Sequence, residues 1–599
     1  MDYEITEERS KYLKARGYTI LTACPGSGKT TSIVYKLLAI SHECVEKYGT
    51  YSGIACLSFT NKACEEILGK YKEMHGQSLH KPHIVSTIDS FITQYITLPF
   101  WYLYPNLKSR PSIINDDELM DKMLKIQYND NGVIKETYDR SITKFGSSTY
   151  IKYPPTYFWK EYQGFSFRGK SVENNSDLHN YATAIFNLKV KKGFINSQDA
   201  SFIGCYILYK YENIAKALAR RFPYLIIDEA QDTSEIHHKI FDKLRTCGSL
   251  NVEYVGDLYQ SIYQWRNARP ELLENKINSN EWNRLYLTEN RRSNQRIIDL
   301  YSLLRNSNDP KIISHKVIDK KIDIVVYRYD NSNIDNIIND FNSICNKNHL
   351  KDSFVLTRGN SLRNKLLGTT QELNYWKSKI PYLILKARSD LYDGSINDAF
   401  NKIRQVVADS KFQLNEYLER KDFLQQIEFD ILFNSNIMKF ILNIPSLDLS
   451  LEEWTAKTES LMRDQFSLLL NPDFQTCKKI SGKKMKELKT ESVNTYYSDK
   501  AKNNGLSVKT IHKVKGATSD AVLLFLDNNS SGKSISLKEF KKKTNTPLTE
   551  KQRLIYVACS RATQFLAFAI PSTISEAEIR KIFGSTISIK NIELQGELF

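Results

Sequence analysis

The sequence predicts an α/β protein built on two doubly wound parallel sheets, and two observations support this. Short apolar runs such as Tyr18–Leu21, Ile54–Phe59 and Tyr224–Ile227 end in polar or acidic residues, and stretches with helical periodicity separate them. A glycine-rich loop follows the first run. Continuous apolar strands with polar groups at their carboxyl ends are typical of parallel sheets covered by helices on both faces.

Composition and charge narrow the class of protein. The 599 residues suffice for about four domains or subdomains. A net charge of +16 favours a polyanionic partner such as nucleic acid. Nine cysteines without a Cys-x-x-Cys pair fit reduced thiols, and no apolar stretch reaches the roughly 18 residues that cross a bilayer. The cysteine pattern leads us to expect no structural metal. We find no secretory or transit signal at the start, so we expect a cytoplasmic protein.

Further along the chain, a second set of strands and two long interruptions appear. The apolar runs Ile322–Tyr327, Phe354–Thr357, Val522–Leu526 and Phe565–Ile570 predict the second sheet. The stretch 330–348 keeps one apolar helical face and predicts an amphipathic helix. The interruptions fall at about 96–200 and 386–504, and we interpret both as mainly helical inserted subdomains. The expected domains are a first core of 1–95 and 201–285, the insertion 96–200, a second core of 286–385 and 505–599, and the insertion 386–504.

The loop after Tyr18–Leu21 is typical of a phosphate-binding loop. Gly26 and Gly28 allow backbone N–H groups to turn toward phosphate oxygens, and Lys29 adds a positive charge. The hydroxyl of Thr30 is a candidate Mg²⁺ ligand. We expect a nucleotide to contact Ala23, Cys24, Pro25, Gly26, Ser27, Gly28, Lys29, Thr30 and Thr31.

Two adjacent carboxylates, Asp228 and Glu229, follow the strand Tyr224–Ile227. Phosphoryl transfer to water uses such a pair, because one carboxylate can hold Mg²⁺ and the next can orient and deprotonate the attacking water. We assign the metal role to Asp228, together with Thr30, and the base role to Glu229.

Further motifs join this pair and the loop in a fixed order. They are Ser58–Ala63, Ser86–Phe91, Asp228–Asp232, Gly256–Arg266, Leu287–Ser293, Thr510–Gly516 and Arg553–Ala562. With the loop at Ala23–Thr31, this series resembles superfamily 1A DNA helicases of the UvrD/Rep/PcrA type. The resemblance implies two RecA-like cores, 1A and 2A, with the insertions 1B and 2B, and ATP and Mg²⁺ in the cleft between the cores.

The resemblance also implies a role for each motif. In the ATP site, Gln260 would sense the γ-phosphate, and Arg292 and Arg561 would neutralise its charge, with Arg561 as the arginine finger. Arg291 stands where the family has a tyrosine that stacks on the base, and a guanidinium can also stack on a purine. Single-stranded DNA would cross both cores. Its expected contacts are Phe59, Thr60, Asn61, Thr87, Tyr263, Trp265, Arg266 and His512.

Three further positions depart from the family's pattern. Arg9 stands where the family usually has the glutamine that reads adenine. The segment Ala517–Ser519 has no carboxylate for the nucleotide sugar, and Asp89 replaces a common histidine. The residues expected to carry hydrolysis are unaffected.

The favoured function is an ATP-dependent 3′-to-5′ translocase and helicase acting on single-stranded or tailed DNA. One alternative is a DNA-responsive ATPase subunit that senses DNA ends or single strands and regulates a partner nuclease, because the compact length resembles the helicase-like subunit of the Gabija anti-phage system. A related branch of RNA helicases is less favoured, because Phe59–Lys62 and Gln260–Arg266 match the DNA branch.

Overall fold

The computed structural model places most of the chain in two compact units. The first unit comprises residues 1–119, 124–359 and 509–599, and the second comprises 120–123 and 360–508. The structure describes residues 5–113, 126–130, 133–137, 141–145, 149–152, 157–159, 165–167, 170–171, 186–187, 190–191, 193–262, 268–315, 322–330, 333–359, 362–363, 366, 376, 380–392, 394–412, 417–467, 469–470, 489–494, 507–527, 534–541, 547–584 and 587–591.

The first sheet of the first unit has six strands in the order β15-β1-β14-β13-β2-β3, all paired in parallel. Alternate residues of β1 enter different hydrophobic clusters, Ile20 on one face and Leu21 on the other. Both faces are therefore buried, which explains the continuous apolar runs in the sequence. The strands are β1 (Tyr18–Ala23), β2 (Ile54–Ser58), β3 (Ile84–Thr87), β13 (Tyr224–Asp228), β14 (Asn251–Gly256) and β15 (Asn283–Leu287).

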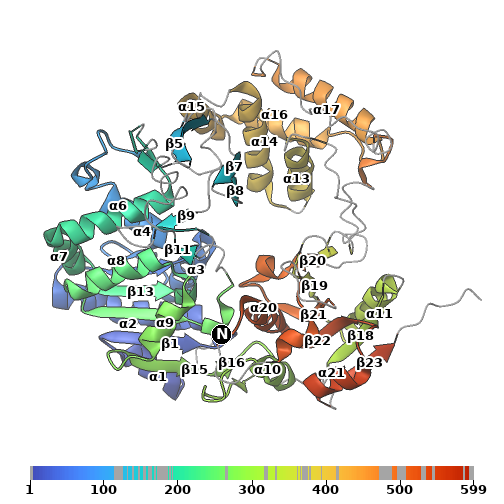
Figure 1. Cartoon of the computed structure of the whole chain (residues 1–599), viewed down its shortest axis with the longest axis horizontal. Coiled ribbons are helices and arrows are strands. Elements are labelled where there is room, and N and C mark those ends of the chain that lie inside the picture. The colour runs from blue at the N-terminus through green and yellow to red at the C-terminus, as the bar shows by residue number, and fades with distance from the viewer. Residues whose placement is uncertain are drawn as a thin grey trace, which may run out of the picture. The chain divides into compact units, whose positions relative to one another are not determined.

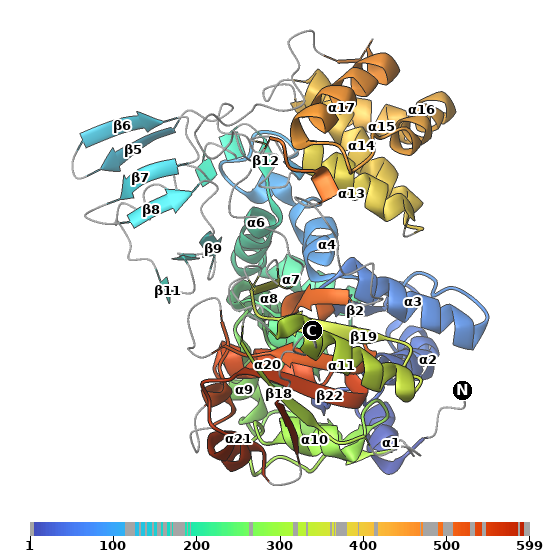
Figure 2. The same cartoon turned by 90° about the vertical axis from the view of Figure 1, so that its right-hand side faces the viewer.

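Helices cover both faces of this sheet (Figure 1). The helix α2 follows the glycine-rich loop, and α6 lies beside α4, as Figure 2 shows. The helices are α1 (Glu7–Lys14), α2 (Lys29–Tyr48), α3 (Asn61–His75), α4 (Ile88–Ile92), α6 (Ser197–Lys210), α7 (Glu212–Arg221), α8 (Glu235–Thr246) and α9 (Pro270–Ile277).

The second sheet has the strand order β20-β19-β21-β22-β18-β23, and its strands from β19 to β23 pair in parallel. The prediction of two parallel-sheet cores is thus confirmed. The amphipathic helix expected within 330–348 is α11, which buries Ile337 and Phe341. The elements are β18 (Val325–Tyr329), β19 (Ser353–Thr357), β20 (Ser507–Thr510), β21 (Ser519–Phe525), β22 (Ala562–Pro571), β23 (Ser588–Asn591), α10 (Gln295–Ser302), α11 (Ile334–Lys347), α20 (Glu550–Cys559) and α21 (Glu576–Phe583).

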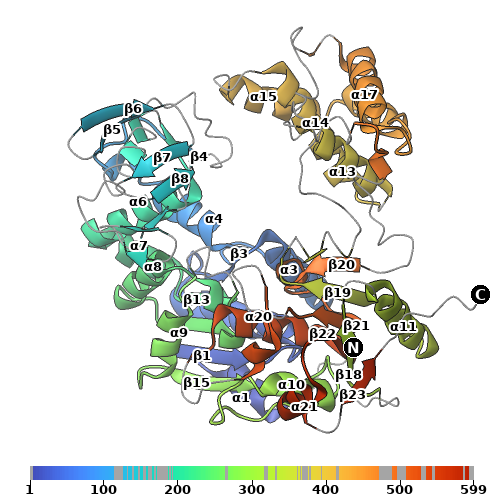
Figure 3. The same ribbon diagram turned by 45° about the vertical axis from the view of Figure 1, so that its right-hand side comes forward.

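The helix α20 lies between the two sheets (Figure 3). Its Arg553 donates from Nε to the carbonyl oxygen of Ser261 at 2.6 Å. Cys24 of the glycine-rich loop and Ile262 pack into the hydrophobic cluster of the second core. The carboxyl ends of β1 and β14 therefore face the second core directly.

The described part of the first insertion differs from the mainly helical expectation. It contains short antiparallel strands. β5 pairs with β6, β7 pairs with β8, and β10 pairs with both β9 and β11. Asn131-Gly132 stands between β5 and β6, a typical hairpin sequence, and tyrosine, phenylalanine and threonine are frequent. The strands are β5 (Ile126–Asp130), β6 (Val133–Thr137), β7 (Ser141–Phe145), β8 (Thr149–Lys152), β9 (Tyr157–Trp159), β10 (Phe165–Phe167) and β11 (Lys170–Ser171).

The second unit is helical in its described part, as expected for the second insertion. Trp376 and Trp454 are buried in its own hydrophobic cluster, and the indole N–H of Trp376 donates to Thr455 at 2.9 Å. The long segment of this unit is 360–508, and its helix α13 packs with α14 and α16. The helices of this unit are α13 (Ile380–Tyr392), α14 (Ile396–Lys411), α15 (Tyr417–Glu428), α16 (Ile431–Leu442) and α17 (Leu451–Phe466). Within the described ranges, no helix is long and apolar enough to cross a membrane.

Candidate active site

The glycine-rich loop Cys24–Gly28 connects β1 to α2, and two of its glycines have backbone conformations that other residues avoid. Gly26 has φ +75° and Gly28 has φ +80°. A Cβ atom on Gly26 would lie 2.5 Å from Cβ of Arg292 and 3.0 Å from Oδ1 of Asn290. Gly28 is the N-cap of α2, so the free N–H groups of the first helical turn are available to an anion.

Lys29, the first residue of α2, lies against the acidic pair at the end of β13. Its Nζ is 3.0 Å from Oδ1 of Asp228 and also contacts Oε1 of Glu229. Burial disfavours the charged form of Glu229, but Lys29 and then Lys515 outweigh it and lower the pKa of Glu229 to about 2. Burial likewise opposes the charge of Lys29, yet the two carboxylates raise its pKa above the usual range. Lys29 and Glu229 are therefore ionised at neutral pH.

Glu229 has φ +52°, in the left-handed region, although it is not a glycine. Such a conformation costs about 1–3 kcal/mol and is found most often at active sites. Directly after Glu229 the chain forms the short helix η4 (Ala230–Asp232). This turn directs the Gln231 amide to the Glu229 carboxylate, so the side chain of Glu229 is held by two neighbours.

Thr30 and Asp228 line the same cavity, as the predicted Mg²⁺ site requires. Oδ2 of Asp228 accepts a hydrogen bond from Ser58 at 3.2 Å. Oδ1 is buried and faces the ammonium group of Lys29. A hydroxyl and a carboxylate suit Mg²⁺, which retains several waters in phosphate sites. Within the described residues, no cluster of three His, Cys, Asp or Glu side chains offers a metal cage.

The second core contributes two guanidinium groups, that of Arg561, which is buried, and that of Arg292, which is partly buried. Nη2 of Arg561 donates to Oε1 of Gln260 at 3.2 Å, and Nε2 of Gln260 donates to Asp257 at 2.8 Å. Arg292 donates from Nη1 to the carbonyl oxygen of Ser560 at 3.1 Å. Burial, and next the nearby charge of Arg292, lower the pKa of Arg561 to about 9. An anion placed between these guanidinium groups would relieve their repulsion.

These groups surround a single cavity of about 740 Å³. The cavity brings together every residue expected to bind the nucleotide or carry hydrolysis. Its lining residues are Ala23, Cys24, Pro25, Gly26, Ser27, Gly28, Lys29, Thr30, Thr31, Phe59, Thr60, Lys62, Ala63, Glu66, Lys70, Asp228, Glu229, Asp232, Asp257, Gln260, Arg291, Arg292, Lys515, Gly516, Thr518, Arg561 and Thr563.

Lys515 and Asp232 were not singled out as site residues, yet they join the two cores beside this cavity. Nζ of Lys515 contacts the Asp232 carboxylate and the carbonyl oxygen of Gln260, the latter at 2.9 Å. Burial, opposed by Lys515, raises the pKa of Asp232 to about 6. Both residues stand inside motifs quoted from the sequence, but their pairing depends on the approach of two segments 283 residues apart.

Arg9 and Glu8 of α1 lie behind the glycine-rich loop. Nη2 of Arg9 donates to the carbonyl oxygen of Ser27 at 3.1 Å, and Arg9 is 2% exposed. The carboxylate of Glu8 accepts hydrogen bonds from the N–H and the hydroxyl of Thr288, both at 2.7 Å. Arg291, in contrast, lines the cavity, and its backbone N–H donates to the carbonyl oxygen of Gly26.

Of the residues expected to contact DNA, those that the structure describes follow or end strands of the two sheets. Phe59 and Thr60 follow β2 and line the cavity, while Thr60 and Thr87 cap α3 and α4 through their hydroxyl groups. Asn61, the first residue of α3, is exposed. Burial lowers the pKa of His512 to about 4, and this residue is hydrogen-bonded to the backbone of Ile262. Tyr263, Trp265 and Arg266 lie outside the described residues.

Comparison with known proteins agrees with this arrangement. Residues 5–281 match the UvrD/REP helicase N-terminal domain. The chain is 22% identical to a probable DNA helicase II homolog of Mycoplasma pneumoniae, covering 94% of this chain and 83% of that protein. It is 26% identical to the ATP-dependent DNA helicase Rep of Buchnera aphidicola, over 65% of this chain and 58% of the relative. The chain is 27% identical to the Gabija protein GajB of Bacillus cereus, over 51% of this chain and 50% of that protein. The predicted resemblance to UvrD/Rep-type helicases and the link to Gabija are thus confirmed.

Proposed function

We propose that the chain is a DNA-dependent ATPase and helicase that moves along single-stranded DNA in the 3′-to-5′ direction. The observation that carries the proposal is one cavity in which Lys29, Glu229 and Thr30 of the first core meet Arg292 and Arg561 of the second. The similarity to DNA helicases supports DNA as the substrate. The polarity follows from the resemblance of the whole motif series.

Hydrolysis begins with the transfer of Lys29 from its carboxylate partners to the phosphates. In the structure, Lys29 neutralises Asp228 and Glu229. A triphosphate held by the loop amides would attract Lys29 more strongly than two carboxylates do, because it carries more charge. Glu229 would then lose its nearest cation, so its pKa would rise and it could accept a proton from the attacking water.

Arg292 and Arg561 act on the charge that spreads over the γ-phosphoryl oxygens in the transition state. Thr30 and Asp228 would hold Mg²⁺, which would add positive charge to this neutralisation. Because Gln260 bonds to Arg561 and precedes the DNA-contacting segment by three residues, it connects the phosphate site to the DNA. We further propose Phe59, Thr60, Asn61, Thr87, Tyr263, Trp265, Arg266 and His512 as the DNA contacts.

The test compares Lys29→Ala and Glu229→Gln with Glu65→Gln. Glu65 is exposed on α3 and lies outside the cavity, so it controls for the loss of one carboxylate. We expect oligo-dT-stimulated ATP hydrolysis to fall at least about 100-fold in both site variants, as for loss of a catalytic base, with Glu65→Gln unchanged. Glu229→Gln should still bind ATP. Undiminished turnover in both site variants would refute the assignment.

A second candidate function has its own observation, the similarity to the Gabija protein GajB. In this alternative, the chain senses DNA ends or single strands and regulates a partner nuclease. Strand displacement on 3′-tailed and 5′-tailed duplexes separates the two proposals. Unwinding of the 3′-tailed duplex alone supports the helicase, whereas DNA-stimulated hydrolysis without displacement favours the regulatory subunit. Stimulation by oligo-U in place of oligo-dT would favour an RNA substrate.

A further inference from the structure

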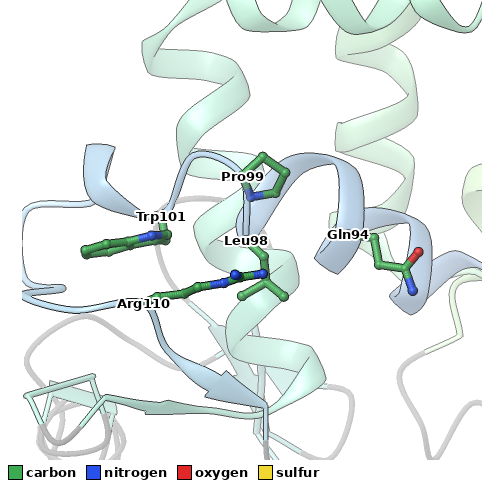
Figure 4. Close-up of a pocket in the computed structure, with 5 residues that line it drawn as sticks. All are labelled: Gln94, Leu98, Pro99, Trp101 and Arg110. Atoms are coloured by element: carbon green, nitrogen blue, oxygen red, sulfur yellow. The ribbon is translucent and has the colours of Figure 1, made fainter.

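A small pocket in the first unit lies outside the ATP site. Its lining residues are Gln94, Leu98, Pro99, Trp101 and Arg110, and its volume is about 300 Å³ (Figure 4). In the figure, the indole ring of Trp101 is seen edge-on, and the Arg110 side chain starts below it and extends away from the ring toward Leu98. Gln94 comes from the neighbouring helical turn. The pocket therefore combines an aromatic plane, a guanidinium group, an apolar floor and one amide.

The helical side of this pocket is held rigidly from behind. Gln94 lies in the π-helical turn η1 (Thr93–Thr97), in which Leu98 donates to the carbonyl oxygen of Thr93. Thr97 is buried and donates from its hydroxyl to the carbonyl oxygen of Ala200 at 2.7 Å. The close contact with α6 depends on Gly204, where a Cβ would lie 2.9 Å from Oγ1 of Thr97. Isolated π-turns of this kind are frequent at functional sites.

The side of the pocket that carries Trp101 and Arg110 is held in place by residues next to them in the sequence. Trp101 begins the short helix η2 (Trp101–Leu103), and the next residue, Tyr104, is buried in edge contacts with Phe186 and Phe202. Arg110 precedes the strand β4 (Ser112–Ile113), which pairs with β12 (Phe194–Ile195). The two planar groups are thus presented by fixed backbone, which lowers the entropy lost when a ligand binds.

Arg110 is available for an external ligand. Its side chain is exposed, and among the described residues it forms no ion pair or hydrogen bond. Lys108, also exposed, adds a second positive charge two residues earlier. Indole and guanidinium planes are the surfaces on which unpaired bases stack, and the positive charge attracts the phosphates that accompany them.

We propose that this pocket binds one base of a single-stranded nucleic acid, stacked against Trp101 and Arg110. This inference rests on the proposed function. The helix α4 starts after Thr87, a proposed backbone contact, and leads directly into the π-turn that carries Gln94. The strand would therefore extend along α4 beyond Thr87, and the pocket would hold it at a point outside the motifs. The amide of Gln94 both donates and accepts, which suits any base.

The experiment combines pocket variants with abasic sites. Binding of the full chain to fluorescent oligo-dT is measured by anisotropy, with a single abasic site moved along the strand. In the wild type, one position facing the pocket should weaken binding by about 5- to 140-fold, the range of base–aromatic stacking. In Trp101→Ala, this position should no longer matter, while the other positions keep their effects. Trp101→Phe should restore the dependence.

Tyr102→Ala serves as the control for Trp101→Ala, and Lys108→Ala serves as the control for Arg110→Ala. Tyr102 is 61% exposed beside Trp101 but does not line the pocket, so Tyr102→Ala should keep the wild-type pattern. Arg110→Ala should weaken binding more than Lys108→Ala, although both remove one charge. If no abasic position couples to Trp101 while the chain binds oligo-dT tightly, the pocket proposal fails and the proposed function stands. If wild-type chain binds no single-stranded DNA, both fail.

Discussion

Gly26→Ala should disrupt the ATP site more than its backbone conformation alone explains. Gly26 and Gly76 have nearly the same φ, +75° and +77°. A Cβ on Gly76 would have nothing within 4 Å, whereas a Cβ on Gly26 would lie 2.5 Å from Cβ of Arg292. Gly76→Ala is therefore a control that keeps the strain and removes the clash.

The magnitude follows from these two contributions. A left-handed alanine costs about 1–2 kcal/mol, and both variants carry this cost. Carbon atoms pack best at about 3.5–4.0 Å, so the new contact in Gly26→Ala overlaps by about 1 Å or more. Forced overpacking adds about 1–3 kcal/mol. The loop or Arg292 must then shift by about 1 Å, a misplacement that can reduce catalysis about 100-fold.

The assay pairs oligo-dT-stimulated ATP hydrolysis with thermal unfolding. We expect Gly76→Ala to lower the unfolding midpoint and leave kcat/KM for ATP within about twofold. Gly26→Ala should lower the midpoint further and reduce kcat/KM by about 100-fold. Equal midpoints and equal kcat/KM in the two variants would show that the contact between Gly26 and Arg292 does not organise the site.

Three other predictions concern titration and packing. The raised pKa of Asp232, about 6, means that the folded state binds more protons than the unfolded chain between about pH 4 and 6, so this group lowers stability as pH rises. The unfolding midpoint of Asp232→Asn relative to wild type should therefore increase from pH 4 to pH 7, and a constant difference would contradict this. His512, with a pKa of about 4, is neutral at pH 6–8, so His512→Asn should leave the salt dependence of single-stranded DNA binding unchanged, unlike loss of a phosphate-binding lysine. Gly204→Ala should cost about 1–3 kcal/mol through its contact with Thr97, whereas Gly69→Ala, with open space around it, should be neutral or stabilising in a thermal unfolding series.

The sheet cores and the grouping of the loop residues around one cavity could be predicted from the sequence because local patterns specify them. A strand buried on both faces, such as Tyr224–Asp228, is a continuous apolar run, and a parallel sheet gathers the carboxyl ends of its strands at one edge. The cavity around Lys29 accordingly contains the expected loop residues and both expected arginines.

Features that depend on the meeting of distant segments could not be predicted. The pairing of Lys515 with Asp232 exists only once the two cores are assembled. The direction of Arg9, toward Ser27 and away from the cavity lining, depends on how α1 packs. The strands of the first insertion were missed for a different reason, because short aromatic segments of three to five residues give too few repeats to establish a period of two.

The described contacts between the two cores are mostly polar, and few of them are apolar. In the described part of the chain, the first-core side chains Cys24 and Ile262 enter the second core's hydrophobic cluster, and the partly buried Tyr259 packs against it. The other connections described above are polar, among them the bonds from Arg561 to Gln260 and from Arg553 to Ser261. Water can replace polar contacts at little cost, whereas separating a large apolar interface would cost many kcal/mol. This composition would let the cores part and rejoin in the proposed catalytic cycle while each sheet keeps its own interior intact.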